Sequence, residues 1–401
     1  MTAISVRNLD VVFGDNTGPA LQLLDQGKTR QEIIKATGSV VGVHNASIDV
    51  QQGEICVLMG LSGSGKSSLL RAVNGLNPIS RGNVLVRDGD SHVDLGNCDA
   101  NTLRRVRAQR VSMVFQKFAL MPWLSVLDNV AYGLELMGMG KTERHKKAME
   151  KLDMVGLAQW KDVLPHELSG GMQQRVGLAR AFSMDSDILL MDEPFSALDP
   201  LIRAQLQDEL IELQRNLNKT ILFVSHDLDE ALKIGSNIAI MESARIIQYG
   251  PPEEIVLNPI NAYVEDFVAH TNPLNVLLGR SLMTRAADLP RANGKVLADN
   301  EKGIWLDMKG QQVVAAECAG KILPIQNCSN SLNGSLPATG TLAVTTPDVS
   351  MRRAIELRYA TELPVVIAEQ GKLVGVLTDH NFYHAMLGKH FTCSSQQQLA
   401  S

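Results

Sequence analysis

The sequence has few cysteines, no long apolar run and no block of like charge in its 401 residues. The cysteines are scattered without C-x-x-C spacing, which argues against a metal site or a disulfide framework and fits reduced thiols. They are Cys56, Cys98, Cys318, Cys328 and Cys393. No apolar run approaches the roughly 18 residues of a membrane span. The N-terminal stretch MTAISVRNLDVVFG also lacks the basic and apolar regions of a secretory signal. We therefore expect a chain that does not itself cross a bilayer and that acts at a membrane only through another subunit.

The charge pattern also argues against some partners. The formal net charge is −5, with basic and acidic residues interspersed, so neither nucleic acid nor anionic lipid is expected as a bulk partner. With 45% hydrophobic residues, a chain of this length can bury more than one core. The composition predicts a folded protein of two domains, or of one domain with appendages.

One segment has the pattern of a strand, a glycine-rich loop and a helix. EICVLMGLSGSGKSS begins with an apolar run and is followed by LLRAVNGL at helical spacing. Its centre fits G-x-x-x-x-G-K-S, in which backbone N–H groups surround a β-phosphate and the lysine reaches the β and γ oxygens. The serine after the lysine is expected to hold Mg²⁺. The alternative is a chance glycine turn. The residues assigned to this phosphate loop (P-loop) site are Gly60, Ser62, Gly63, Ser64, Gly65, Lys66, Ser67 and Ser68.

Two later apolar runs end in residues suited to catalysis. DILLMDEP ends in Asp192 and Glu193, and TILFVSHD leads to His226. Such runs are typical of parallel strands buried on both faces. Beside a P-loop, Asp192 is expected to hold Mg²⁺ through water, and Glu193 to orient or deprotonate the attacking water. The alternatives are an acidic strand end that caps a helix, and a histidine with a structural or surface role.

The region between these runs contains a second pattern suited to anions. Gln116 follows the strand-like run VSMVF, so its amide is placed to reach a metal ion or the attacking water. Helical spacing then continues, which predicts a mostly helical subdomain at about 117–182. Within it, LSGGMQQRVGLARAF places Ser169, Gly170 and Gly171 ahead of a helix. A helix N-terminus binds anions through its unpaired N–H groups.

Together these motifs resemble those of the nucleotide-binding subunits of ABC transporters. The resemblance implies an α/β P-loop ATPase core with a helical subdomain, and ATP and Mg²⁺ as cofactors. It assigns Lys66, Glu193 and His226 to catalysis. It assigns the metal to Ser67, Gln116 and Asp192. The family's signature corresponds to Leu168–Met172, which reads LSGGM where LSGGQ is commoner, and its D-loop corresponds to Ser196–Asp199.

The resemblance explains why one chain would need two anion sites. In this family two subunits pack head to tail, and each ATP lies between the P-loop of one copy and the signature of the other. A second copy of the chain is therefore the first expected partner. The signature residues expected to contact ATP from the other copy are Ser169, Gly170, Gly171 and Met172, and Asp199 of the D-loop is expected to contact it as well.

The N-terminal part of the sequence indicates which group within the family the chain resembles. The segment ALQLLDQGKTRQEIIKATG, within an insertion at about 18–40, is expected to be helical. It is similar to what ATPases of glycine betaine, proline and choline importers carry. The choline importers are the most similar and the glycine betaine importers come next. The implied partners are integral membrane permease subunits and, indirectly, a solute-binding protein. The implied location is peripheral, on the cytoplasmic face of the inner membrane. A soluble ABC ATPase that acts on ribosomes or DNA is a less favoured alternative.

Two assignments stay open between alternatives. Phe13 is the candidate for stacking on adenine, and the alternative is a core aromatic on the first strand. The stretch FALMPWLSVLDN at 118–129 lies where the family receives a helix of the membrane subunit. Its apolar side chains would suit an exposed groove, or they could be buried in the helical subdomain.

The last third gives a weaker signal. We place the domain boundary at 278, and within 279–401 LPVVIAEQGKLVGVLTDHNFYHAML predicts two strands around a turn at Gln370 and Gly371. A helix with Asp379 near its start follows. This resembles the end of a CBS module, which implies a small α+β regulatory domain, whereas 280–335 departs from that pattern. A structural appendage is the alternative, and the tail TCSSQQQLAS is expected to be disordered.

Overall fold

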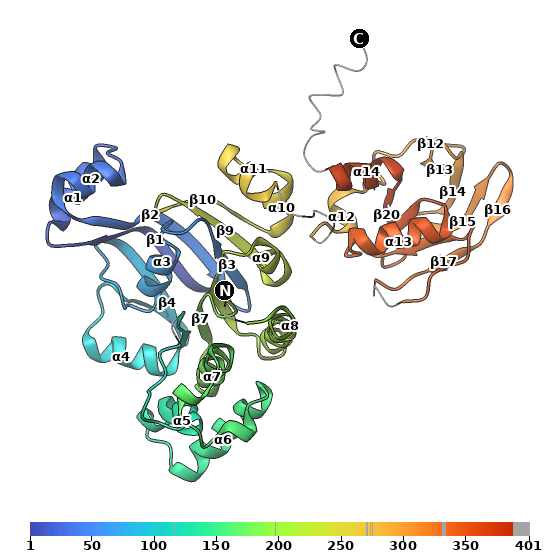
Figure 1. The fold of residues 1–401 in the computed structure, drawn as a ribbon. Coiled ribbons are helices and arrows are strands. Elements are labelled where there is room, and N and C mark those ends of the chain that lie inside the picture. The colour runs from blue at the N-terminus through green and yellow to red at the C-terminus, as the bar shows by residue number, and fades with distance from the viewer. Residues whose placement is uncertain are drawn as a thin grey trace. The chain divides into compact units, whose positions relative to one another are not determined.

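The chain divides into two compact units. The computed structural model describes residues 1–116, 118–196, 198–269, 272, 274, 276–330 and 334–387, so the tail TCSSQQQLAS lies outside the described residues. The units are Met1–Pro252 and Glu253–Ser401 (Figure 1). The second unit starts ahead of residue 278 because Leu257 packs against its core and Glu253 accepts a hydrogen bond from Ser281.

The first unit is built around a mostly parallel sheet in the order β10-β9-β3-β8-β7-β6. All pairs are parallel except β10 with β9. Every residue of β3, β7 and β8 is buried, which explains why their sequences are continuously apolar. The strands are β3 Ile55–Met59, β6 Val111–Val114, β7 Ile188–Asp192, β8 Thr220–Val224, β9 Asn237–Glu242 and β10 Arg245–Gly250.

A second, antiparallel sheet shares one core with the first. Its order is β2-β1-β4-β5, formed by β1 Thr2–Phe13, β2 Val40–Gln51, β4 Arg81–Asp88 and β5 Ser91–Asp94. Residues from both sheets meet α3 in this core, for example Val43 of β2, Leu58 of β3 and Leu69 of α3. The remaining helices of this part are α3 Lys66–Val73, α4 Ala100–Gln109, α8 Pro200–Leu217 and α9 Leu228–Ile234.

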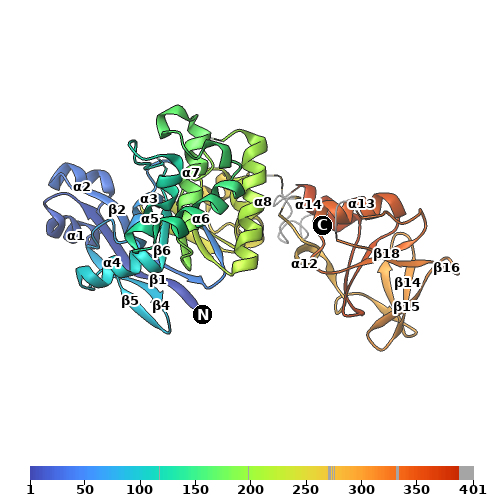
Figure 2. The same cartoon turned by 90° about the horizontal axis from the view of Figure 1, so that it is seen from below.

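The inserted segment between β1 and β2 forms two helices, as predicted. They are α1 Thr17–Asp25 and α2 Arg30–Thr37. Figures 1 and 2 both place them at the end of the β1–β2 hairpin, away from α5 and α6. A small core of their own joins Ala20, Leu24 and Ile33 to Val12 and Val41 of the adjacent strands. The insertion is therefore a packed part of the first unit.

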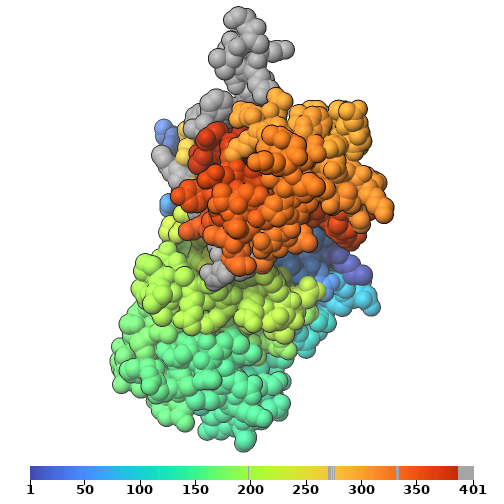
Figure 3. Space-filling model, turned by 90° about the vertical axis from the view of Figure 1, so that its right-hand side faces the viewer, coloured from blue at the N-terminus to red at the C-terminus, as the bar shows by residue number. Residues whose placement is uncertain are grey.

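The predicted helical subdomain is also present. It contains α5 Val126–Leu136, α6 Lys141–Met154 and α7 Gly170–Ser183, with short 3₁₀ turns at Ala158–Trp160 and Pro165–Glu167. Its core includes Val130 of α5, Leu152 of α6 and Val176 of α7. On the face shown in Figure 3, the surface of this subdomain (green) adjoins that of the residues around α8 (yellow-green).

The second unit is a mixed α+β structure. Its sheet follows the order β12-β13-β14-β15-β20-β19-β18-β17, with β11 paired to β20 and β16 to β15. The strands are β11 Thr284–Arg285, β12 Arg291–Ala292, β13 Lys295–Asp299, β14 Ile304–Lys309, β15 Gln312–Cys318, β16 Lys321–Leu323, β17 Ile325–Asn327, β18 Leu342–Thr345, β19 Val365–Glu369 and β20 Lys372–Leu377. The helices are α10 Pro252–Leu257, α11 Ala262–Val268, α12 Gly279–Leu282, α13 Met351–Thr361 and α14 Asp379–Leu387.

The end of this unit has the elements that the sequence predicts. The strands β19 and β20 pair around Gln370 and Gly371, and α14 begins at Asp379. Both turn residues have positive φ values, 50° and 80°, as a two-residue hairpin turn with the right-handed twist requires. The β18-α13-β19-β20-α14 order is therefore present, whereas 284–318 consists of short antiparallel strands.

No helix among the described residues combines the length and the apolar character that crossing a bilayer requires.

Candidate functional site

The P-loop connects the central strand β3 to helix α3. Three of its glycines, Gly60, Gly63 and Gly65, have positive φ values of 144°, 76° and 105°. At Gly65 a Cβ would lie 2.3 Å from the backbone oxygen of Gly42 on β2, so only glycine allows the loop to pass so close to that strand. Ser62, Gly63 and Gly65 of this loop line a cavity.

Lys66 begins α3 and folds back over the loop. Its Nζ donates to the carbonyl oxygens of Gly60 at 2.8 Å and Leu61 at 3.1 Å. Burial lowers the pKa of the Lys66 ammonium, although the carboxylates of Glu193 and Asp192 act in the opposite direction. A phosphate at this position would favour the charged form of the lysine. The side chain is thus positioned for an anion that this loop would bind.

Asp192 is fully buried behind the P-loop. Its two carboxylate oxygens accept hydrogen bonds from Ser67 Oγ at 2.8 Å and Arg71 Nη2 at 3.1 Å. The carboxylate is 0% exposed, and a buried charge needs such partners. Asp192 and Ser67 therefore place two oxygen groups side by side, and oxygen ligands are those that Mg²⁺ prefers. Among the described residues no cluster of three or more histidine, cysteine, aspartate or glutamate side chains forms a metal site.

Glu193 contacts side chains that follow the ends of two other strands. Gln116, which follows β6, donates from Nε2 to Glu193 Oε2 at 3.2 Å. His226, which follows β8, places Nδ1 at 3.3 Å from the same oxygen. The backbone of Glu193 has a φ of 49°, which is unusual for a residue other than glycine. It is held by Val224 O, which accepts its N–H, and by Gln174 Nε2, which donates to its carbonyl.

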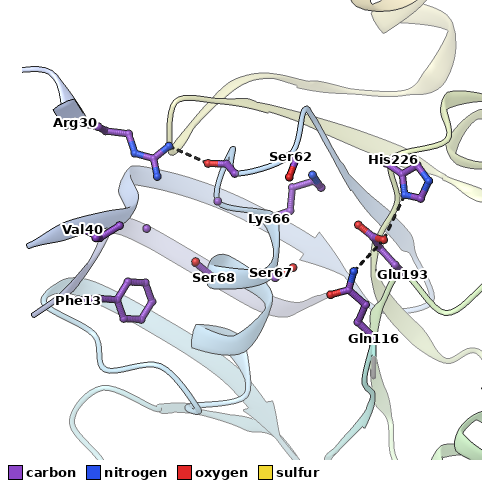
Figure 4. Close-up of a pocket in the computed structure, with 13 residues that line it drawn as sticks. Phe13, Arg30, Val40, Ser62, Lys66, Ser67, Ser68, Gln116, Glu193 and His226 are labelled. Carbon is purple, nitrogen blue, oxygen red and sulfur yellow. Dashed lines mark hydrogen bonds and ion pairs between the residues drawn. The ribbon is translucent and has the colours of Figure 1, made fainter. Parts of the chain in front are cut away.

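These groups line one cavity of about 580 Å³, the P-loop cavity, shown in Figure 4. The predicted residues in its lining are Phe13, Ser62, Gly63, Gly65, Lys66, Ser67, Ser68, Gln116, Glu193 and His226. Three further lining residues were not predicted from the sequence, namely Arg30, Val40 and Gly42. The predicted Gly60 and Ser64 belong to the loop without lining the cavity, and Asp192 lies behind Ser67.

Phe13 forms the end of the P-loop cavity opposite Glu193 and His226 (Figure 4). Its ring packs over Gly42, where a Cβ would lie 2.5 Å from the ring atom Cε2. The ring also packs, partly buried, against the main core. Both environments considered from the sequence are therefore present in one side chain, and stacking on adenine stays a prediction.

Comparisons with known proteins identify the family. The family model described as "ABC transporter" matches residues 43–196. The chain is 53% identical to the glycine betaine transport ATP-binding protein OpuAA of Bacillus subtilis, over 71% of this chain and 67% of the relative. It is 40% identical to the glycine betaine/carnitine transport ATP-binding protein GbuA of Listeria monocytogenes, over 97% of this chain and 98% of the relative. The chain belongs to the glycine betaine/osmoprotectant group of ABC transporter ATP-binding proteins.

Solved structures of the family also match this chain over part of its length. The dimeric structure of MJ0796, a bacterial ABC transporter cassette, is 28% identical with a TM-score of 0.54 and covers 62% of this chain and 98% of that chain. The dimeric post-hydrolysis state of the same cassette, bound to ADP and Pi, matches with the same TM-score at 27% identity and the same coverage. As an ABC transporter ATP-binding protein, the chain is an ATPase.

The signature of this ABC ATPase lies at the start of α7. Ser169 is the N-cap, and its Oγ accepts the backbone N–H of Met172 at 3.3 Å. Gly170 and Gly171 form the first turn of the helix. None of these four residues lines the P-loop cavity of the same chain. The two anion-binding elements predicted from the sequence are therefore separate sites within one copy.

The D-loop residue Asp199 also lies outside the cavity lining. It caps α8 by accepting the N–H of Ile202 at 3.0 Å, and Pro200 follows it at the first helical position. Ser196 donates from Oγ to the carbonyl of Glu193, which connects the predicted D-loop to the predicted catalytic residue. Ala197 lies outside the described residues.

The stretch that follows Gln116 combines the two environments considered for it. Leu120 packs, partly buried, against the core of the helical subdomain, whereas Trp123 is 72% exposed. Phe118 and Ala119 both have positive φ values, and Arg180 of α7 donates hydrogen bonds to their carbonyl oxygens. The stretch is therefore fixed to the signature helix while Trp123 remains on the surface.

Proposed function

We propose that this chain is the ATP-hydrolysing subunit of an importer for glycine betaine or a closely related quaternary ammonium solute. The observation that carries the proposal is the P-loop cavity, in which Lys66, Gln116, Glu193 and His226 meet at the ends of adjacent parallel strands. Relatives are named for glycine betaine, alone or with carnitine or proline betaine. These names favour glycine betaine over the choline that the sequence resemblance put first.

The chemistry assigned to the cavity follows from its donors. The P-loop N–H groups and Lys66 would bind the phosphates of ATP, and Glu193 would accept a proton from the attacking water. Gln116 and His226 both contact Glu193 Oε2 and so fix the direction of that carboxylate. Mg²⁺, held by Ser67, Asp192 and the amide oxygen of Gln116, would neutralise phosphate charge.

The complete site would require a second copy. The signature residues are absent from the lining of the P-loop cavity in their own chain, and the matching cassette MJ0796 was solved as a dimer. We place Ser169, Gly170, Gly171 and Met172 of one copy at the ATP held by the P-loop of the other, with Asp199 nearby. Permease subunits and a solute-binding protein would complete the importer, with this chain peripheral on the cytoplasmic face of the membrane.

Uptake measurements test the solute assignment. In cells that make this chain with its membrane and solute-binding subunits, labelled glycine betaine should enter at least about tenfold faster than labelled choline at equal concentration. Both rates should fall to background when the chain carries Glu193→Gln. Faster uptake of choline would reverse the assignment of the solute, and solute uptake that is unchanged by Glu193→Gln would contradict the role of the chain.

The end of the second unit is proposed to be a CBS-like regulatory module. Its support is the β18-α13-β19-β20-α14 order. Within it, Arg358 of α13 donates from Nε and Nη2 to Asp379 of α14 at 2.7 and 2.6 Å. A bidentate pair of this kind fixes the two helices relative to each other. The antiparallel strands of 284–318 do not follow this order.

Truncation tests the regulatory proposal. A chain that ends at Pro252 should retain ATP turnover. In the full chain, coupling between the two units should change turnover about fivefold or more with ionic strength or added nucleotide, and the shortened chain should lose most of this change. ATP turnover and solute uptake of both chains would be measured across a salt series, with unfolding temperatures as the control for folding. Identical responses of the two chains would identify the second unit as a structural appendage.

A further inference from the structure

The inserted helices bring an arginine to the P-loop cavity. Arg30 is the first residue of α2, directly after the N-cap Thr29. Thr29 Oγ1 accepts the N–H of Glu32 at 3.3 Å, and Glu32 Oε2 accepts the N–H of Thr29 at 2.8 Å. This capping box defines where the helix begins, so the backbone at Arg30 has a fixed position.

The insertion itself is anchored on both sides. Ile33, on the same helix as Arg30, is completely buried in the small core that joins α1 and α2 to the strands. Asp25 at the end of α1 forms an ion pair of 2.9 Å with Arg81 of β4. The helix that carries Arg30 is therefore held against the first unit from its apolar face and from its connection to α1.

Only part of the hydrogen-bonding capacity of Arg30 is used. Its Nη1 donates to the carbonyl oxygen of Gly63, in the P-loop, at 2.8 Å. Its Nε is buried without a hydrogen-bond partner among the described residues, and none of their carboxylates pairs with the guanidinium. Burial lowers the pKa of Arg30, which is the effect expected when a cation is desolvated without an opposite charge.

The position of the Arg30 guanidinium at the P-loop cavity suits the binding of a ligand. In Figure 4 the guanidinium lies over the part of the P-loop cavity between Phe13 and the P-loop, on the side opposite His226. A guanidinium has five N–H donors in a planar fork that fits phosphate oxygens. Phe13, at the end of the same space, presents an aromatic face and suits the base instead.

We propose that Arg30 binds the phosphate chain of the nucleotide, so that the inserted helices form part of the nucleotide site. The inference rests on the proposed placement of ATP in the P-loop cavity. It makes the segment 17–37 a contributor to affinity from outside the P-loop motif. A nucleotide would complete the charge balance of Arg30 and tie α2 to the loop more firmly than the Gly63 contact alone.

Binding of ADP and of adenosine to the full chain distinguishes phosphate binding by Arg30 from a purely structural role, in which Arg30 only holds α2 to the P-loop through Gly63. Arg30→Gln removes the charge and keeps a side-chain N–H donor, and it should weaken ADP binding about tenfold while leaving adenosine binding unchanged. The affinity for ADP should also become less sensitive to salt. Titration calorimetry gives the ADP affinities, and competition against ADP gives those for adenosine.

Three further variants make the outcome decisive. Lys35→Ala, on an exposed position of the same helix, should bind ADP as the unmodified chain does. Phe13→Ala should weaken ADP and adenosine binding by the same factor of a few, because stacking acts on the base. Lys66→Ala should weaken ADP binding more than Arg30→Gln does. Unfolding temperatures without nucleotide confirm that each variant folds.

The results distinguish failure of the inference from failure of the site. Unchanged ADP affinity in Arg30→Gln, or an equal loss of affinity for ADP and adenosine, would overturn the role of Arg30 in phosphate binding. Unchanged ADP affinity in Lys66→Ala would instead overturn the placement of the nucleotide in this cavity. Should Arg30→Gln not fold, Arg30→Lys replaces it. This variant keeps the charge but loses the planar fork, so it should weaken ADP binding by a factor of about three and leave adenosine binding unchanged. Equal changes for the two ligands would overturn the role of Arg30.

Discussion

Glu193→Gln is expected to lower ATP turnover by about 100-fold or more, because the variant removes the group that accepts a proton from the attacking water. The amide has nearly the same shape as the carboxylate, and its oxygen can still accept the hydrogen bond that Gln116 Nε2 donates. The backbone at 193 is held by Val224 and Gln174 rather than by its own side chain. Affinity for ATP should therefore stay within a factor of about three of the unmodified value. Phosphate release and nucleotide titration on the same preparation measure both quantities.

A matched control separates this effect from a general change of charge. Glu212 lies on an exposed position of α8, and Glu212→Gln makes the same chemical change away from the P-loop cavity. Its turnover should equal that of the unmodified chain. Turnover by Glu193→Gln within tenfold of the unmodified rate would show that another group takes the proton, and His226 would then be the first candidate because it contacts the same carboxylate.

The meeting of Lys66, Gln116, Glu193 and His226 at one end of the P-loop cavity could be predicted because each of these residues belongs to a local pattern. The sequence around Lys66 marks a loop and a helix start, and the apolar runs ahead of Gln116, Glu193 and His226 mark buried strands. Parallel strands bring their carboxyl ends to one edge of a sheet. Residues as far apart in the chain as Ser67 and Asp192, 125 positions, therefore meet.

The opposite end of the cavity could not be predicted in the same way. Arg30, Val40 and Gly42 belong to no motif, and their position depends on how the inserted helices pack on β1 and β2. The capping residues Thr29 and Glu32 reveal a helix start but not what lies beside it. In the second unit, the hairpin of β19 and β20 has a local turn signal, whereas the pairing of β15 with β20 joins distant segments.

Ser169→Arg is expected to abolish turnover, by about 100-fold or more, while leaving nucleotide binding to a single copy unchanged. Ser169 is exposed and does not line the P-loop cavity of its own chain. Loss of its N-cap costs about 1 kcal/mol, so the fold should survive. In the dimer proposed above, however, the arginine would place bulk against the phosphates held by the partner copy. ADP titration measures nucleotide binding, and phosphate release measures turnover. Size-exclusion chromatography with ATP measures dimer formation, with the Glu193→Gln chain as the reference.

Ser169→Ala is the control, because it removes the same cap without adding bulk. Its turnover should fall by no more than about tenfold, the equivalent of one lost hydrogen bond. Loss of ADP binding by Ser169→Arg in the single copy would place the signature at the phosphates of its own chain and contradict the dimer proposal.

Mixing the two inactive variants gives the sharpest test of a site shared between copies. In a mixed dimer, one site combines the intact Glu193 of the Ser169→Arg chain with the intact signature of the Glu193→Gln chain. Random pairing of equal amounts makes half of the dimers mixed, each with one complete site, so about a quarter of the unmodified turnover should return. If each chain instead used its own signature, every site in the mixture would carry a defect and no activity would return. Recovery on mixing therefore requires that Ser169 and Glu193 act on the same ATP from different copies.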